Sequence, residues 1–149
     1  MAKEQIYWEE VEGGQEIPAL AKHPNTVQLV LWAGASGDLN PIHYDKDFAI
    51  ANNLPGQIVH GRLTFAFLSQ MVTDWIGVEG TLKKLGVSFR GMHGPITYAG
   101  EDLISKGKVS KKYIKDGEHY AELEIHAENP RGEVTTLGSA TVVLPSKVK

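Results

Sequence analysis

The 149-residue sequence contains no cysteine, which excludes disulfide bonds, thiolate nucleophiles and cysteine-ligated metal sites. It also lacks any apolar run close to the roughly 20 residues of a membrane-spanning helix. Basic residues are not in excess: 15 Lys and Arg against 18 Asp and Glu give a net charge of −3, whereas nucleic-acid-binding domains usually carry a basic face. The first residues, Met1-Ala2-Lys3-Glu4-Gln5, lack the apolar segment of a signal peptide. We therefore expect a cytoplasmic protein that binds neither nucleic acid nor membrane.

The composition that remains is that of an ordinary globular domain. Hydrophobic residues make up 42% of the chain and charged residues 22%. A chain of this length can bury a hydrophobic core of useful size. We expect one domain over residues 1–149, with a flexible tail at 146–149.

The strongest helix signal lies between Gly61 and Ile76, where apolar side chains cover more than one helical face and Gly77 supplies a stop. The segment is nearly apolar all round, so we expect a buried central helix, about 24 Å long at 1.5 Å per residue. Two shorter helices are predicted before it. One runs over about 26–36 with Asn25 or Thr26 as its N-cap, and one follows Asp45 through Ala51.

Extended segments dominate the rest of the chain. The clearest is 121–128, where small or aliphatic residues alternate with Glu and His, the period of a half-buried antiparallel strand. Several strands packed on one apolar helix predict an α+β domain in which a curved antiparallel sheet wraps around the helix. The predicted strands are 81–90, 102–110, 119–128 and 133–144, with a further strand or edge segment at 6–8 and turns at 12–15, 91–100, 115–117 and 129–132.

Two titratable residues, Asp38 and His43, lie five positions apart in a segment that cannot be regular helix. Pro41 fixes its own φ and disfavours the α conformation at Asn40, so the segment turns and the two side chains can approach each other. At neutral pH a free Asp, with a pKa of about 3.9, is ionised, while a free His, at about 6.5, can accept a proton. This pair suits proton transfer. The structural alternative is a turn in which Asp38 and Asn40 cap backbone groups and His43 is an ordinary surface residue.

The segment Asp38-Leu39-Asn40-Pro41-Ile42-His43, followed by Ile58-Val59-His60-Gly61, closely resembles the MaoC-like dehydratases. These form the (R)-specific enoyl-thioester hydratase branch of the hot-dog superfamily. The resemblance runs from about Ala33 through the helix that follows Gly61, about a third of the chain. It departs from the family pattern at residues 92–95.

The resemblance implies a hot-dog domain, a dimer with sites at its interface, and substrates carried as thioesters of coenzyme A or acyl carrier protein. It implies no cofactor. Homodimer and heterodimer both remain open. The catalytic residues that it implies are Asp38 and His43, which hold the reacting water, and Gly61, whose N–H binds the thioester carbonyl. It implies Asn40 and Ser69 as supporting residues. His60, directly before Gly61, is a further supporting candidate on its position, as a ligand, a second acid or a residue that orients the turn.

The chemistry of such a reaction agrees with these residue types. Adding water to a 2-enoyl thioester requires a base for the water, an acid for C2 and a donor for the oxygen on which charge develops. Asp38 and His43 can fill the first two roles, in either assignment. Gly61 at the start of a helix offers a free N–H and the positive end of the helix dipole. We therefore expect a hydro-lyase that interconverts trans-2-enoyl and (R)-3-hydroxyacyl thioesters.

Several alternatives remain open. The same fold can catalyse thioester hydrolysis, and a non-catalytic or partner-dependent dehydratase subunit would bind thioesters without turnover. Ser69 can instead donate its hydroxyl to the carbonyl four residues earlier, and His60 can serve mainly to orient the turn before the helix. A metal site built from Asp38, His43, His60 and Asp45 is not expected, because no pair of ligands has helical spacing.

Overall fold

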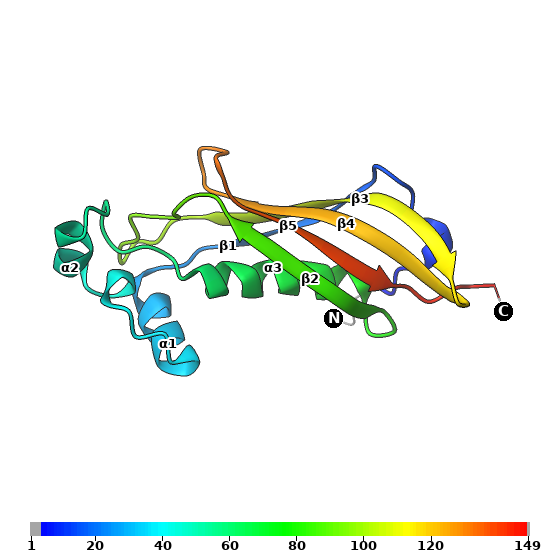
Figure 1. The fold of residues 1–149 in the computed structure, drawn as a ribbon, viewed down its shortest axis with the longest axis horizontal. Coiled ribbons are helices and arrows are strands. Elements are labelled where there is room, and N and C mark those ends of the chain that lie inside the picture. Colours follow the sequence, from blue (N-terminus) through cyan, green and yellow to red (C-terminus); the bar gives the residue numbers. More distant parts are fainter. Residues whose placement is uncertain (1–3, 149) are drawn as a thin grey trace.

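The computed structural model describes residues 4–148. Within this range one antiparallel sheet of five strands, in the order β1-β3-β4-β5-β2, packs on helix α3 (Figure 1). The strands are β1 (Glu16–Lys22), β2 (Thr81–Phe89), β3 (Leu103–Lys115), β4 (Glu118–Glu128) and β5 (Val134–Val143). The helices are α1 (Thr26–Ser36), α2 (Lys46–Ala51) and α3 (Gly61–Ile76), with short 3₁₀ helices η1 (Trp8–Glu10) and η2 (Pro41–His43). The predicted α+β arrangement of a sheet around a helix is confirmed.

Helix α3 runs along the sheet and forms the centre of the core, as predicted. Its sheet-facing side is buried, and burying a single large apolar side chain such as Leu68 or Met71 contributes about 1.5–3 kcal/mol. The expectation that it is apolar all round is wrong. Phe65, Gln70 and Thr73 lie on an exposed side, so α3 is amphipathic and covers one face of the sheet.

The alternating small or aliphatic and polar residues of β4 form a half-buried strand, as predicted. Ala121, Leu123, Ile125 and Ala127 are all buried in the core with α3. The turn between β3 and β4 contains Asp116 and Gly117 with φ of 52° and 78°, the left-handed pair that a tight hairpin requires. Sequence pattern and turn chemistry therefore set the register of this hairpin together.

Three predictions at the edges of the domain need correction. Strand β1 was not predicted: Pro18 interrupts its pattern, and the pairing with β3 shifts register between Ile17 and Leu20, a bulge that an edge strand tolerates. The 6–8 segment is not a strand and leads into the 3₁₀ helix η1, although Ile6 and Trp8 do pack against the core. The expected flexible tail fails in part, because Ser146 donates to Glu9, as does the backbone N–H of Lys147 at 3.1 Å. Lys149 lies outside the described residues.

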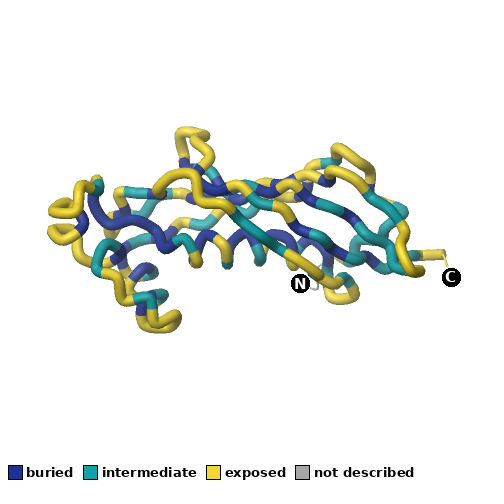
Figure 2. The backbone as a smooth tube through the Cα atoms, in the orientation of Figure 1, coloured by how far each residue is buried: buried dark blue, intermediate teal, exposed yellow. Residues whose placement is uncertain are grey.

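One end of the molecule carries the short helices α1 and α2 and the loops around them (Figure 1). Their outer surfaces are exposed, whereas the 57–60 segment between them and α3 is buried (Figure 2). That segment pairs with the 93–96 segment: Val59 N–H donates to the His93 carbonyl at 2.9 Å, and Ile96 N–H to the Gln57 carbonyl at 2.7 Å. The start of α3 is therefore held in a fixed place. Among residues 4–148, none of the helices combines the length and apolarity needed to span a bilayer.

Candidate active site

The loop that presents Asp38 begins where α1 ends. Gly37 closes that helix in the left-handed conformation, with φ of 75°, which glycine adopts without strain. Asn40 then accepts from the Ile42 N–H at 3.3 Å and caps η2, while its own N–H donates to Asp38 Oδ1 at 3.4 Å. Asn40 thus braces the loop between Asp38 and His43.

His43 is fixed by a hydrogen bond that also defines its tautomer. Its Nδ1 lies 2.8 Å from the carbonyl oxygen of Ile58. Because a carbonyl only accepts, Nδ1 carries the proton, and in the neutral ring Nε2 keeps its lone pair. That Nε2 is directed to Asp38 Oδ2 at 4.0 Å. His43 can therefore accept a proton on the side of the ring that faces Asp38.

The 4.0 Å separation between His43 Nε2 and Asp38 Oδ2 is too long for a direct hydrogen bond. A water oxygen at about 2.8 Å from both atoms would see them at an angle of about 90°, which is acceptable for water. The His43 side chain is only 9% exposed, whereas that of Asp38 is 39% exposed. The pair therefore combines a buried imidazole with a carboxylate open to solvent, spaced to share one water molecule.

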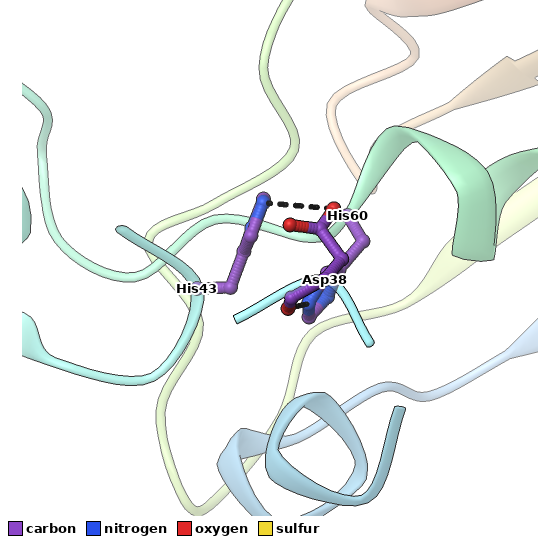
Figure 3. Close-up of side chains that lie close together, drawn as sticks. All are labelled: Asp38, His43 and His60. Carbon is purple, nitrogen blue, oxygen red and sulfur yellow. Dashed lines mark hydrogen bonds and ion pairs between the residues drawn. The ribbon is translucent and has the colours of Figure 1, made fainter. Parts of the chain in front are cut away.

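His60 completes the group (Figure 3). Its ring stacks on that of His43, with centroids 3.7 Å apart and planes 19° from parallel, and its Nε2 lies 3.4 Å from the Asp38 carbonyl oxygen. The residue is completely buried. Burial, and next the positive charge that His43 can carry, lower the pKa of His60 below 6.5. His60 is therefore neutral at neutral pH.

A cavity of about 330 Å³ opens beside this group. Asp38, His43 and Gly61 line it, together with Thr64 of α3 and Phe89 at the end of β2. Gly61 is the first residue of α3, where backbone N–H groups lack a partner within the helix, and no acceptor for its N–H is found among the described residues. The cavity thus brings together the carboxylate of Asp38, the imidazole of His43 and the first residue of helix α3.

Asp38, His43 and His60 each offer one ligand atom, and these atoms lie within 4.8 Å of one another. The stacking argues against a shared ion, because the in-plane lone pairs of nearly parallel rings run side by side instead of converging on one point. The Nδ1 of His43 is already committed to Ile58. The geometry suits proton transfer better than metal binding.

Ser69 is the one predicted site residue that is not brought to this group. Its hydroxyl donates to the Phe65 carbonyl at 2.9 Å, the i−4 bond that polar residues commonly make within helices. It is absent from the cavity lining formed by residues 4–148. Its implied supporting role has no contact here to act through.

One residue that lines the cavity, His93, was not predicted from the sequence. The residue is buried, and neither ring nitrogen has a hydrogen-bond partner within the described part of the chain. Its Nε2 lies 3.7 Å from Glu101, whose other oxygen lies 3.7 Å from Arg131. Burial lowers the pKa of His93. The only sequence signal was the departure from the family pattern at 92–95.

A larger cavity of about 1290 Å³ lies elsewhere, between the N-terminal segment and β1, β3 and β4. Its charged side chains include Lys108 and Glu124, which pair across strands at 3.1 Å. Neither Asp38 nor His43 lines it. The smaller cavity therefore holds the candidate chemistry.

Comparisons with known proteins agree with this architecture. The family model of the MaoC like domain matches residues 9–121, so the chain belongs to the MaoC-like domain family. The R-hydratase PhaJ1 from Pseudomonas aeruginosa, in its unliganded form, superimposes with a TM-score of 0.81 at 25% identity, over 96% of this chain and 88% of that one. The expectation of a hot-dog domain of MaoC-like type is thereby confirmed.

Two curated relatives show how the similarity is distributed. The (R)-specific enoyl-CoA hydratase of Aeromonas caviae is 26% identical over 135 residues, which cover 91% of this chain and 96% of that protein. Fatty acid synthase subunit beta of Saccharomyces cerevisiae is 46% identical over 87 residues, which cover 56% of this chain but 4% of that subunit. The chain thus spans only a small part of the fatty acid synthase subunits that it matches.

Proposed function

We propose that this chain catalyses the reversible hydration of trans-2-enoyl thioesters to (R)-3-hydroxyacyl thioesters. The observation that carries the proposal is the placement of Asp38 Oδ2 and His43 Nε2, 4.0 Å apart, on the cavity that also contains the start of α3. The names of the relatives in Aeromonas caviae and Rhodospirillum rubrum, both (R)-specific enoyl-CoA hydratases, support the choice of reaction and stereochemistry.

In the hydration direction the water shared by Asp38 and His43 attacks C3 of the substrate. One member of the pair takes the water proton, C2 receives a proton from the pair, and no net proton is gained or lost. Because two such close groups titrate as a unit, the pair carries both roles together. Dehydration is the same sequence in reverse.

The Gly61 N–H, at the positive end of α3, donates to the thioester carbonyl oxygen as negative charge builds on it. A donor fixed in place before the reaction needs no reorganisation, and removing one such donor from an enzyme typically costs about 10²–10³-fold in turnover. A glycine here also lets the thioester approach the backbone closely.

The substrate is carried on coenzyme A or acyl carrier protein. At about 330 Å³ the cavity is at the lower end of the range for small-molecule sites, roughly 300–1,000 Å³. It can hold the reacting end of the acyl thioester, and a long acyl tail or the carrier must extend out of it.

We further propose that the chain acts as a dimer. Light scattering on the purified protein, alone and with co-expressed MaoC-like chains, would distinguish homodimer from heterodimer.

The direct test follows the loss of 2-enoyl absorbance of crotonyl-CoA, with chiral analysis of the product, for the wild type and Asp38→Asn. Formation of the (R)-alcohol by the wild type, and its near absence in the variant, is the expected result. Release of free thiol would identify a thioesterase instead. Binding of acyl thioesters without turnover, across chain lengths and on both carriers, would identify a binding subunit and overturn the proposal.

A further inference from the structure

His60 contacts both members of the acid–base pair but does not line the cavity as the described residues form it. Its Nε2 meets the backbone carbonyl of Asp38, and its ring covers one face of the His43 ring (Figure 3). It comes from the N-cap position of α3, whereas Asp38 and His43 come from the loop after α1. One side chain on the buried α3 segment therefore connects the two catalytic candidates to the core.

The contacts of His60 define its charge and tautomer. The Asp38 carbonyl can only accept, so the proton of the ring is on Nε2. Nδ1 is buried and has no partner among residues 4–148. A second proton placed there would be a buried charge without an acceptor, which is costly. The titratable groups that face the ring from the neighbouring elements are His43 and Asp38.

His43 carries its proton on the other ring nitrogen, Nδ1. Its Nδ1–H donates to the Ile58 carbonyl, and its Nε2 faces the Asp38 carboxylate at 4.0 Å. Two stacked imidazoles 3.7 Å apart cannot both be protonated without strong repulsion. At most one ring of the stack can therefore carry a positive charge, and the unpartnered, buried Nδ1 of His60 leaves that ring neutral.

We propose that His60 is a positioning residue for the hydration reaction: a neutral, Nε2-protonated imidazole that holds the His43 ring by stacking and the Asp38 backbone by a hydrogen bond. This inference rests on the proposed function. Its consequence is that His60 sets the separation of Asp38 and His43 without itself touching the substrate.

Two substitutions separate the contacts. His60→Phe keeps a planar ring against His43 and loses the donor to Asp38, while His60→Gln keeps a donor at the position of Nε2 and loses the ring. His60→Ala removes both. His126→Gln serves as the matched control, because His126 lies on β4 outside the 330 Å³ cavity.

We expect kcat for crotonyl-CoA hydration to fall on the order of 10-fold in His60→Phe and His60→Gln and about 10²-fold in His60→Ala, because small displacements of reacting groups have effects of this size. KM should change less than threefold, since His60 does not line the cavity. A fall in kcat at nearly constant KM distinguishes a positioning residue from one that binds the substrate.

A measurement on the wild type makes the outcome independent of whether these variants fold. Ring ¹⁵N chemical shifts, followed from pH 8 to pH 6.5, should show His60 mainly as the neutral Nε2–H tautomer. A mainly protonated His60 ring, or a proton on Nδ1 in place of Nε2, would overturn the inference, as would folded His60→Phe and His60→Gln variants with wild-type kcat. Failure of the proposed function looks different: the wild type itself would lack hydratase turnover, and the ring shifts would still decide the charge and tautomer of His60.

Discussion

The ring of Phe89 lies directly against the Cα of Gly61. A Cβ built on Gly61 would come within 2.8 Å of Phe89 Cζ and 3.0 Å of Cε1. Phe89 ends β2, at the edge of the sheet, and Gly61 begins α3, and both residues line the 330 Å³ cavity. A side chain at position 61 would therefore displace the Phe89 ring or enter the cavity where the substrate is proposed to approach.

Gly61→Ala tests this relationship. The new methyl group must push the half-exposed Phe89 ring aside or occupy the cavity itself. We expect a loss of turnover on the order of 10²-fold, comparable to the loss of one hydrogen-bond donor for the carbonyl oxygen. Stability should change by less than about 1 kcal/mol, because alanine is the better helix former and Phe89 can move. Enoyl-CoA kinetics and urea unfolding measure the two effects.

The double variant Gly61→Ala/Phe89→Ala is the control. With the ring removed, the methyl group has space on that side, and part of the lost turnover should return relative to Gly61→Ala. The single variant Phe89→Ala is measured beside it. If the double variant loses as much turnover as the losses of the two single variants multiplied together, the Phe89 contact does not cause the loss in Gly61→Ala.

Asp38→Asn and His43→Asn examine the acid–base pair with little change of shape. Asp38 is partly exposed, and the amide of an asparagine at 43 can still donate to the Ile58 carbonyl in place of Nδ1. Each variant should stay folded and lose about 10²–10⁴-fold in turnover, the usual size of a general acid–base contribution. Circular dichroism checks the fold. Near-wild-type activity in either variant would remove that residue from the proposed mechanism.

The parts of the fold that were predictable are those in which local chemistry and burial agree. Asn25 and Asp45 cap α1 and α2 as predicted, each accepting from a backbone N–H three residues later. Strand β1 was not predictable because its pairing is decided by contact with β3, far away in the chain, and Pro18 hides its alternation. The apparent all-round hydrophobicity of α3 misled because Phe65 contributes to the pattern yet lies on the exposed side.

The candidate site also has a part that the local sequence predicts and a part that depends on the assembled fold. The proximity of Asp38 to His43 follows from a local turn, so their spacing in the sequence predicts it. The stack of His60 on His43 and the lining by His93 depend on how the 57–60 segment lies against the 93–96 segment and against the loop after α1. No local pattern encodes such contacts between segments far apart in the chain, and only the assembled fold reveals them.

Ser69→Ala addresses a residue that the family resemblance implied and the structure places elsewhere. Because the Ser69 hydroxyl is bonded to the Phe65 carbonyl within α3, its removal should change kcat and KM by less than threefold. Helix stability should change little, since such a bond competes with the helical backbone pattern rather than extending it. A fall in turnover of tenfold or more would mean that Ser69 rotates toward the substrate during the reaction.

The buried histidines make stability depend on pH in a direction that can be stated. The pKa values of His60 and His93 in the folded protein are lowered below 6.5, chiefly by burial, so below that pH the unfolded chain binds protons that the folded chain does not. The free energy of unfolding should therefore decrease as the pH falls from about 7.5 to about 5.5, before most carboxylates titrate.

His23 has the opposite effect on stability. Its hydrogen bonds to Asp102 and to the Ala99 carbonyl raise its pKa, so its stabilising contribution is lost as the pH rises. Urea unfolding across this range should show a weaker acid destabilisation in His93→Gln than in the wild type and a stronger one in His23→Gln. If the free energy of unfolding depends on pH equally in His93→Gln and in the wild type, His93 binds its proton equally well in the folded and the unfolded chain.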